Sequence, residues 1–562
     1  MTANTTEHKF RNTVLAAATA FLLAACAAQQ QVAQDAFTIS VLGTNDVHGQ
    51  LLPSGERAGL AAISAYADAL RAARREDGGA VLVIDAGDMW QGTLESNLVE
   101  GAAVVEAYNA IGFDAAAIGN HEFDFGPVGR KAIPEDIGDD ARGALKKRAA
   151  EANFPVLAAN LIDEATGLPV DWDNVRPSVM LDVQGIKVGV IGVMTARALQ
   201  TTISANTPGL SVAPLAPTIQ SQASKLRKRG AAIVIVTAHA GGRCTEFDDP
   251  TDLSSCGIDS EIMRVARALP AGLVDHIIAG HVHQGIAHIV NGIPITSSYS
   301  STRAFSRVDL KVNRESGAVV SRTVYPPHWA CLYVVKTTGQ CADLSDGSGE
   351  IVAAVYEGRE IRPNPAVLEI AGRAAAFAAR TKDEKLGVYL EAAFKHPPAT
   401  ESPLANLMTD ALLEASDADI AIHNVVGGIR NTLPEGELTF GAVYEMFPFD
   451  NRVVRLHLSG RELRELIATQ AHNHGRRLGF SGMRVFVGCT NGTMDIVMQR
   501  PDGSPVRDED QMTVTANDYL ALGGDNILTP VMPAGGFAID DGMPLVRDML
   551  VDWFRARGGT LA

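Results

Sequence analysis

The chain has 562 residues, which exceeds the roughly 250 to 300 residues at which one hydrophobic core stops growing, so at least two domains are expected. An apolar fraction of 46% with 20% charged residues excludes a disordered or fibrous protein. The formal net charge of −17 argues against a nucleic-acid polymer as a partner, because binding a phosphate backbone needs a basic surface. A small anionic substrate is still compatible with this charge.

The first residues have the pattern of an export signal. Lys9 and Arg11 precede an apolar run over residues 14–25, which is too short to span a bilayer as a mature helix. The run ends in Leu-Ala-Ala-Cys, which resembles the lipobox of bacterial lipoproteins, in which the cysteine is lipidated. We expect a signal peptide over residues 1–25, a lipid anchor on Cys26, a polar tether over 26–35 and a periplasmic or cell-surface location. The alternative is a soluble secreted protein cleaved nearby.

Export also permits disulfide bonds. Cys244 and Cys256 form one close pair and Cys331 and Cys341 another, both in loops rich in Gly and Asp, while Cys489 is left over. A zinc site is an alternative, but neither pair has the Cys-x-x-Cys spacing that such sites use. We therefore expect one disulfide within each pair.

From about residue 37 to 310, apolar strand-like runs alternate with helix-like stretches. The expected strands cover residues 37–42, 80–84, 115–118, 187–193, 231–236 and 274–278. This pattern predicts an α/β domain over residues 36–345. An Ala-rich, charged segment at residues 365–385 has the composition of a helix. We interpret it as a helix that links the two domains, within a linker region spanning residues 346–385.

A second set of elements follows this link. Strands are expected at 386–392, 418–423 and 511–516, and helices at 403–415, 461–470 and 545–555. The order predicts an α+β domain over residues 386–562.

Five times in the first domain, an apolar strand runs into residues that can bind metal. The residues are Asp46, His48, Asp88, Asn120, His121, His239, His281 and His283. If the backbone stays extended after the strands, residues two apart share a face, so Asp46 and His48 converge on one point, as do His281 and His283. We also expect the glycines before Asp88, Asn120 and His281 to let the chain turn sharply there.

Carboxylate, amide and imidazole donors without thiolate suit divalent metals such as zinc, manganese or iron. Two such ions can share a bridging carboxylate. The sequence therefore predicts a site for two divalent metal ions at one sheet edge.

The order Asp-x-His, Gly-Asp, Gly-Asn-His-Glu, His and Gly-His-x-His resembles that of the calcineurin-like metallophosphoesterases. The longer strings at residues 119–124 and 154–160 are similar to the 5′-nucleotidase and UDP-sugar hydrolase branch. By this resemblance one metal is held by Asp46, His48, Asp88 and His283, and the other by Asp88, Asn120, His239 and His281. His121 and Asp124 then form the catalytic pair.

Three motifs in the second half are similar to the substrate-domain motifs of the same family. They lie at residues 424–430, 447–451 and 517–525. The resemblance implies that Arg430 contacts an anionic group, that Phe449 and Tyr519 stack on the base, and that Asn424 and Asp525 contact the nucleoside. Stacking tolerates any base, so it predicts a broad preference.

The chain departs from the family pattern in three places. Thr400 replaces an arginine that usually precedes the glutamate at position 401, so that one anion contact is missing. The stretch from Asn424 to Arg430 is one residue longer than usual, and His283 occupies a position at which relatives differ.

These observations predict a two-domain metallophosphoesterase in which an N-terminal α/β sandwich is joined by a helix to an α+β 5′-nucleotidase C-terminal domain. The expected reaction releases phosphate from nucleotides, most of all nucleoside 5′-monophosphates, with UDP-sugars as further substrates. One alternative is another ester specificity of the same family, such as a 2′,3′-cyclic phosphodiesterase with 3′-nucleotidase activity or a sulfur-ester hydrolase. The other is a surface nucleotide-binding protein without catalysis.

Overall fold

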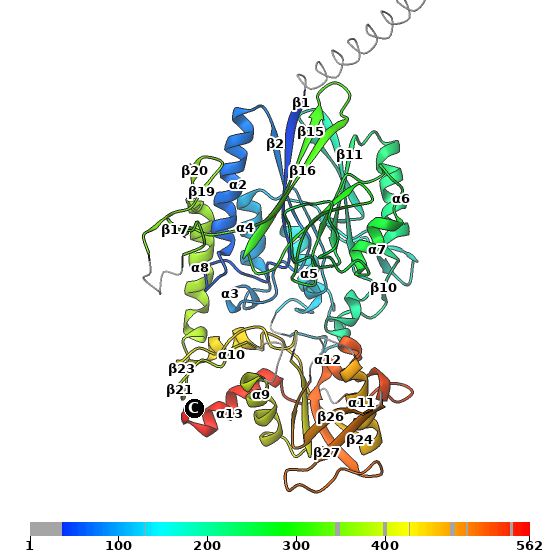
Figure 1. Cartoon of the computed structure of the whole chain (residues 1–562), viewed down its shortest axis with the longest axis vertical. Coiled ribbons are helices and arrows are strands. Elements are labelled where there is room, and N and C mark those ends of the chain that lie inside the picture. The colour runs from blue at the N-terminus through cyan, green and yellow to red at the C-terminus, as the bar shows by residue number, and fades with distance from the viewer. Residues whose placement is uncertain are drawn as a thin grey trace, which may run out of the picture.

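The computed structural model describes residues 36–129, 131–342, 349–396, 402–425, 427–472, 478–490, 493–539 and 543–561. The chain forms two lobes, an upper one built from the first half and a lower one built from the second half (Figure 1). The predicted signal peptide, Cys26 and Thr400 lie outside the described residues.

The first lobe contains two β-sheets that pack face to face. The seven-stranded sheet has the order β16-β15-β1-β2-β3-β4-β7. Its strands are β1 (Ala36–Thr44), β2 (Ala80–Asp85), β3 (Ala115–Ala117), β4 (Val156–Leu157), β7 (Val175–Arg176), β15 (Ala304–Asn313) and β16 (Val319–Trp329). The strands from β1 to β7 run parallel, whereas β15 and β16 are antiparallel.

The six-stranded sheet has the order β13-β14-β12-β11-β9-β8. Its strands are β8 (Ser178–Val183), β9 (Ile186–Met194), β11 (Ile233–His239), β12 (His276–Ala279), β13 (Gly285–Val290) and β14 (Ile293–Ser298). Residues that face inward from both sheets, such as Val41, Leu310, Val190 and Ile235, share one hydrophobic core. The continuous apolar runs of the central strands fit this burial on both faces.

Helices cover the outer faces of the two sheets. The helices α2 (Gly59–Glu76), α4 (Ala102–Ile111) and α5 (Gly143–Glu151) contribute to the core outside the first sheet. The helices α6 (Leu215–Lys228) and α7 (Glu261–Ala268) pack outside the second. The lobe is therefore a four-layer sandwich, which confirms the predicted α/β class. All six expected strands are present, with ends shifted by a few residues.

The second lobe is an α+β domain with two hydrophobic cores. Its sheets have the orders β24-β28-β22-β25, β23-β21-β29 and β26-β27. The strands are β21 (Lys385–Leu390), β22 (Ile420–Asn424), β23 (Gly436–Thr439), β24 (Val453–Ser459), β25 (Leu478–Ser481), β26 (Arg484–Thr490), β27 (Thr493–Gln499), β28 (Gln511–Asn517) and β29 (Gly559–Leu561). The main helices are α9 (Pro403–Glu414), α10 (Phe440–Met446), α11 (Gly460–His472) and α13 (Val546–Arg557).

The smaller elements fill the connections. They are α3 (Leu94–Asn97), α12 (Asp518–Ala521), β5 (Leu161–Asp163), β6 (Leu168–Pro169), β10 (Leu210–Val212), β17 (Tyr333–Val335), β18 (Ile351–Ala353), β19 (Val355–Tyr356) and β20 (Arg359–Glu360), with short 3₁₀ turns at His121–Phe123, Ala198–Gln200, Ser204–Asn206, Gly524–Asn526 and Thr529–Val531.

The predicted linking helix is present as α8 (Pro365–Lys382). Its first half is part of the first lobe's core through Val367 and Ala371. Its second half reaches a small cluster in which Ala378 packs with Leu94 and Tyr444. The helix therefore lies along the upper lobe and ends at the lower one (Figure 1).

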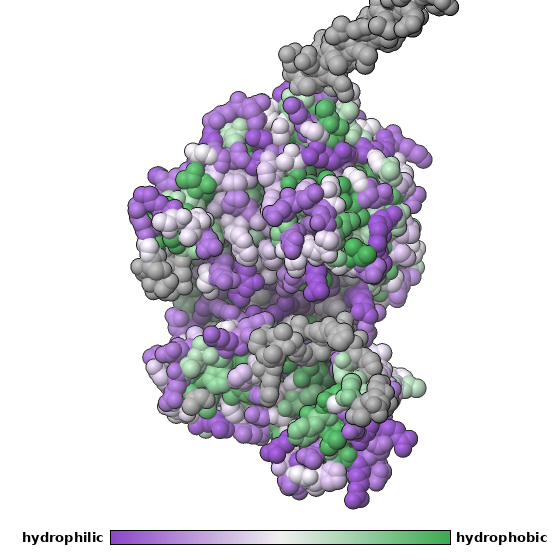
Figure 2. All heavy atoms as spheres, viewed as in Figure 1, coloured by the Kyte–Doolittle hydropathy of each residue, from purple (hydrophilic) through white to green (hydrophobic). Residues whose placement is uncertain are grey.

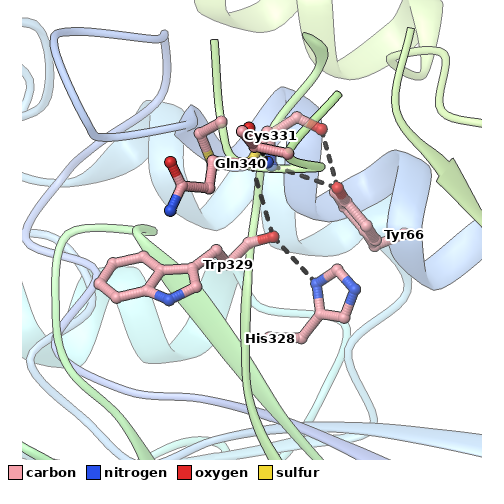
Figure 3. Close-up of a disulfide and its surroundings, with 7 residues drawn as sticks. Tyr66, His328, Trp329, Cys331 and Gln340 are labelled. Carbon is pink, nitrogen blue, oxygen red and sulfur yellow. Dashed lines mark hydrogen bonds between the residues drawn. A yellow bond between two sulfur atoms is a disulfide. The ribbon is translucent and has the colours of Figure 1, made fainter. Parts of the chain in front are cut away.

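Both expected disulfides are formed, between Cys244 and Cys256 and between Cys331 and Cys341, and Cys489 is a free, exposed thiol. The backbone of Cys331 is bonded in both directions to the Tyr66 hydroxyl, which donates to its carbonyl at 2.8 Å and accepts from its N–H at 3.2 Å (Figure 3). The second disulfide therefore anchors its loop to α2.

Hydrophilic side chains predominate at the constriction between the two lobes on the face drawn in Figure 2. Within the described part of the chain, no helix has both the length and the apolar character needed to cross a bilayer.

Candidate active site

The carboxyl ends of strands from both sheets of the sandwich meet at the edge that faces the second lobe. Asp46, Asp88 and Asn120 follow β1, β2 and β3 of the first sheet, whereas His239 ends β11 and His281 follows β12 of the second. Parallel strands place such residues at one edge, as the sequence predicted.

One group of donors consists of Asp46, His48 and His283, whose ligand atoms lie within 4.8 Å of one another. His283 Nε2 lies 3.0 Å from His48 Nε2 and 3.4 Å from Asp46 Oδ1. Asp46 is fully buried. Three donor atoms of this kind that face one point have the geometry of a site for one of the two predicted metal ions.

The other group consists of Asp88, His239 and His281, again within 4.8 Å. His239 Nε2 lies 3.1 Å from Asp88 Oδ2 and 3.0 Å from Asn120 Oδ1. His281 Nδ1 lies 3.1 Å from the same Asn120 oxygen. All seven predicted ligands are therefore brought together.

Backbone carbonyls hold two of these imidazoles in the tautomer that a metal requires. His48 Nδ1 lies 2.9 Å from the carbonyl of Gln91, and His239 Nδ1 lies 2.8 Å from the carbonyl of Ala86. Because a carbonyl only accepts, each Nδ1 carries a proton, which leaves Nε2 as the nitrogen that can bind a metal in the neutral ring. Such outer hydrogen bonds are typical of histidine metal ligands, so the residues present fit divalent metal ions.

The charge state of the donors also fits a cation. Burial by itself raises the pKa of Asp46, but the neighbouring His283 outweighs it and lowers that pKa to about 2. Burial lowers the pKa of His281 to about 3. Metal ligands must be ionised carboxylates and neutral imidazoles, and these two side chains are in those forms at neutral pH.

The prediction that the ligands lie on extended backbone is wrong. Five of them have left-handed backbone, with φ of 49° at Asp46, 51° at His48, 57° at Asp88, 76° at His281 and 57° at His283. The physical reason is that β1 and β12 end before these residues, and the chain turns at the ligands themselves. Non-glycine residues in this region cluster at functional sites.

The glycines beside the ligands also have a different role from the one expected, with Gly87 as the exception. Gly87 has a φ of 91° and does form a turn. At Gly119, a Cβ would lie 2.2 Å from Asp88 Oδ1, and at Gly280 it would lie 3.0 Å from Asp46 Oδ2. These two glycines therefore make room for the carboxylates.

Glu122 is a functional residue to which the sequence assigned no role. Its buried carboxylate accepts hydrogen bonds from the backbone N–H groups of Asp88 at 2.9 Å, Met89 at 2.7 Å and Gly119 at 2.6 Å. It thus clamps the two loops that carry Asp88 and Asn120. The sequence did contain a signal for this role of Glu122. An ionisable residue inside the Gly-Asn-His-Glu string needs hydrogen-bond partners if it is buried.

His121 and Asp124 are paired as predicted, with Nδ1 and Oδ2 2.6 Å apart. The hydroxyl of Thr202 donates to the other Asp124 oxygen at 2.7 Å, a partner that no sequence motif indicated. Burial by itself lowers the pKa of His121, but the Asp124 and Asp88 carboxylates outweigh it and raise the pKa.

The second lobe reaches this pair directly. The Arg430 guanidinium lies 3.2 Å from His121 Nε2. The ring of Phe449 stacks on that of His121 with centroids 5.7 Å apart, and Arg430 lies 5.1 Å from the centroid of Phe449. The side chain of Gln91 donates to the carbonyl of Pro448 at 3.0 Å. The two predicted half-sites thus face each other.

One cavity of about 950 Å³ connects the metal-ligand candidates with the residues of the second lobe. The predicted substrate residues Asn424, Arg430, Phe449, Tyr519 and Asp525 all line it. The side-chain N–H of Asn424 donates to Asp525 at 3.3 Å. A cavity of this size accommodates a nucleotide.

Comparison with known proteins agrees with this architecture. The family model for calcineurin-like phosphoesterases matches residues 39–285, and that for the 5′-nucleotidase C-terminal domain matches residues 378–532. A 5′-nucleotidase of Vibrio cholerae is 26% identical over 554 residues, which cover 91% of this chain and 90% of the relative.

Another relative, endonuclease YhcR of Bacillus subtilis, is 27% identical over 509 residues, but the match spans 88% of this chain and only 38% of that longer protein. Among solved structures, a 5′-nucleotidase precursor from Thermus thermophilus superimposes with a TM-score of 0.70 at 22% identity, covering 94% of this chain and 98% of that one. This likeness shows that the fold is shared.

Two family models thus account for most of the chain, in the same order and on the two lobes that form the cavity. The chain belongs to the 5′-nucleotidase family and is a phosphoric ester hydrolase, in which a calcineurin-like phosphoesterase domain that uses divalent metal ions precedes a 5′-nucleotidase C-terminal domain.

Proposed function

We propose that this protein hydrolyses phosphate esters of nucleotides, with nucleoside 5′-monophosphates as the leading substrates and nucleotide sugars as further ones. One observation carries the proposal: the metal-ligand candidates and the His121–Asp124 pair open into the same cavity as Arg430 and Phe449. Similarity to a protein named as a 5′-nucleotidase over nearly its whole length adds support.

We propose two divalent ions, one held by Asp46, His48, Asp88 and His283 and the other by Asp88, Asn120, His239 and His281. Two such ions supply Lewis acidity at the phosphoryl group and lower the pKa of water to the neutral range. The backbone carbonyls of Gln91 and Ala86 accept hydrogen bonds from His48 and His239 and thereby orient these two ligands.

The remaining roles belong to side chains of both lobes. His121 Nε2 donates a hydrogen bond to the phosphoryl group and the departing oxygen, and Asp124 keeps the ring in position. Arg430 binds the phosphate from the side of the second lobe, because a guanidinium can donate two parallel hydrogen bonds to a pair of phosphate oxygens. The rings of Phe449 and Tyr519 stack on the base, and Asn424 and Asp525 contact the nucleoside.

We also propose export, with lipidation at Cys26. The two disulfides support export, because such bonds persist outside the reducing cytosol. Mass spectrometry of the mature protein tests the anchor: a diacylglyceryl group on an N-terminal Cys26 is expected, and an unmodified N-terminus at another residue contradicts it.

Phosphate release tests the function. The purified protein is incubated with manganese or zinc and with nucleoside 5′-monophosphates, 3′-monophosphates, 2′,3′-cyclic nucleotides, UDP-glucose and a sulfur ester, with the His121→Ala variant as control. Turnover of the 5′-monophosphates that is lost in the variant is expected. If only the other esters are turned over, the protein is a phosphoesterase whose substrates are those esters and not the 5′-monophosphates. If nucleotides bind without any turnover, the result favours the non-catalytic alternative.

A further inference from the structure

Two loops of the phosphoesterase domain bring a pair of arginines to the cavity. Arg57 lies in the loop that leads from His48 to α2, and Arg303 lies between β14 and β15. The N–H of Gly59 donates to the Thr302 hydroxyl at 2.8 Å, which ties one loop to the other.

The second loop is also fixed to the metal-ligand edge. The N–H of Ser301 donates to the carbonyl of Asp46 at 2.7 Å. The loop that carries Arg303 is therefore tied to the segment that carries Asp46, and both arginines line the cavity.

The protein gives the Arg57 guanidinium no partner among the described residues and gives that of Arg303 only one ion pair, with Glu56. Among the described residues, the half-buried side chain of Arg57 has no hydrogen bond and no ion pair. The Nε atom of Arg303 is buried without a partner, and its nearest carboxylate, that of Glu56, is 3.8 Å away and 84% exposed. Buried polar atoms without a partner are rare in folded proteins and call for a ligand or another cause.

The positive charges gather on both sides of the cavity. Arg430 lines it from the second lobe, and Arg57 and Arg303 line it from the first. Burial first, and then the charge of Arg303, lower the pKa of Arg57. Glu445 also lies on the wall, but its carboxylate is bonded to Lys382 at 2.8 Å. Among the described residues, Arg57 is therefore a cavity-lining cation without a paired carboxylate, and Arg303 has only the exposed carboxylate of Glu56.

We infer that Arg57 and Arg303 form a second anion subsite, which binds a second phosphoryl group joined to the scissile one. This inference rests on the proposed function and assigns two residues to those of its substrates that carry a diphosphate group. Guanidinium groups bind phosphate through paired hydrogen bonds, which satisfy the nitrogens that the protein leaves free.

The subsite suits a leaving group that is itself a phosphate. A water oxygen bonds to the phosphorus of the scissile phosphoryl group, the P–O–P bond breaks, and the bridging oxygen leaves with the electron pair, while the water protons pass to solvent. The negative charge that develops on the departing phosphate lies between the two arginines, where it is stabilised most in the transition state.

The test compares the full-length protein with the Arg57→Gln/Arg303→Gln variant on uridine monophosphate, uridine diphosphate and UDP-glucose at saturating manganese. The ratio of kcat/KM for either diphosphate compound to kcat/KM for the monophosphate is expected to fall roughly tenfold to a hundredfold, since each hydrogen bond to a charged group is worth about 1.5 to 3 kcal/mol. A fall with only one diphosphate compound supports the subsite and identifies that compound as its ligand. An unchanged ratio with both overturns the inference.

The exposed Arg75 at the end of α2 provides a matched control. The Arg75→Gln variant removes the same charge and is expected to leave all three rates unchanged. If the double variant does not reach the wild-type melting temperature, the Arg57→Gln variant alone carries the comparison.

A binding measurement separates this inference from the proposed function. If the wild-type protein turns over no nucleotide, the proposed function fails, and calorimetric titration with a methylene-bridged uridine diphosphate then tests the subsite without turnover. At least tenfold weaker binding by the double variant is expected. Equal affinities contradict the subsite.

Discussion

Several ligand candidates hold a backbone conformation that L-residues avoid. A left-handed φ costs a non-glycine residue about 1 to 2 kcal/mol. At Asp46 and His48 the cost is offset by hydrogen bonds from their N–H groups to the carbonyls of Gly87 at 2.9 Å and Asp88 at 3.0 Å. The loops after β1 and β2 thus hold each other, so the ligands stand in place before a metal binds.

Asp124 is placed to orient His121, and its amide variant tests that role. In the Asp124→Asn variant, the neutral amide no longer stabilises the doubly protonated ring whose Nε2 donates to the substrate, so the pKa of His121 falls and kcat is expected to fall by about 10² to 10⁴ with little change in KM. Steady-state kinetics measures both. The Asp173→Asn variant, which changes an exposed carboxylate, is the control, and equal kcat values in the two variants contradict the role.

The buried imidazole of His276 makes stability depend on pH. Burial lowers the pKa of this imidazole to about 3 from its ordinary value of 6.5. The stabilisation is therefore complete above pH 6.5 and is lost as the pH falls from 6.5 towards 3, because only the unfolded chain takes up the proton. Between pH 7 and pH 5 this one residue accounts for about 2 kcal/mol.

Urea unfolding of the wild-type protein and the His276→Gln variant at pH 7 and pH 5 measures this contribution. The variant is expected to lose about 2 kcal/mol less than the wild type over this interval. The exposed His457 supplies the control variant His457→Gln. The same pH dependence in the wild type and both variants rules out the assignment.

At the scale of elements, the loop after β16 depends on covalent and hydrogen-bonded anchors. The Cys331–Cys341 bond joins residues 10 apart, and Tyr66 of α2 binds the backbone of Cys331. The ring of Tyr66 also packs against Phe305, with centroids 5.0 Å apart. This loop is thereby fixed to the first helix of the sandwich.

Removing this disulfide is expected to lower the stability of the phosphoesterase domain. The Cys331→Ser/Cys341→Ser variant loses on the order of 3 kcal/mol, because the unfolded chain gains the conformations that the cross-link excludes. Calorimetry shows this as a lower melting temperature. The Cys489→Ser variant, which removes a free and exposed thiol, serves as control, and equal melting temperatures refute the expectation.

At the scale of the whole molecule, the active site exists only because the two lobes face each other. Arg430 and Phe449 contact His121 across the cavity. Contacts beside α8 hold this arrangement, since Lys382 pairs with Glu95 of the first lobe and Glu445 of the second, each at 2.8 Å. Neither lobe alone contains both the metal ligands and the aromatic residues.

Replacing Phe449 tests whether the second lobe selects substrates by stacking. The Phe449→Leu variant keeps apolar packing but loses the aromatic face, so KM for nucleoside monophosphates is expected to rise roughly tenfold to a hundredfold. Glycerol phosphate, which has no base, is expected to show a smaller change. The exposed Phe377 of α8 supplies the control variant Phe377→Leu, and equal changes with both substrates contradict stacking.

The sequence determined the elements and the ligand set of this protein. Apolar runs of strand length between helical stretches gave the α/β class, and donors placed after those runs indicated the sheet edge where Asp46, Asp88 and His239 meet. These inferences succeed because strand direction and hydrophobic periodicity are local properties.

Only the tertiary structure decided how the donors are aimed and what surrounds them. The left-handed turns at the ligands, the clamp formed by Glu122, the hydroxyl of Thr202 and the arginines at positions 57 and 303 that line the cavity all depend on contacts between distant segments. Such contacts follow from loop packing, which has no periodic signature along the chain, so they could not be predicted from the order of the residues.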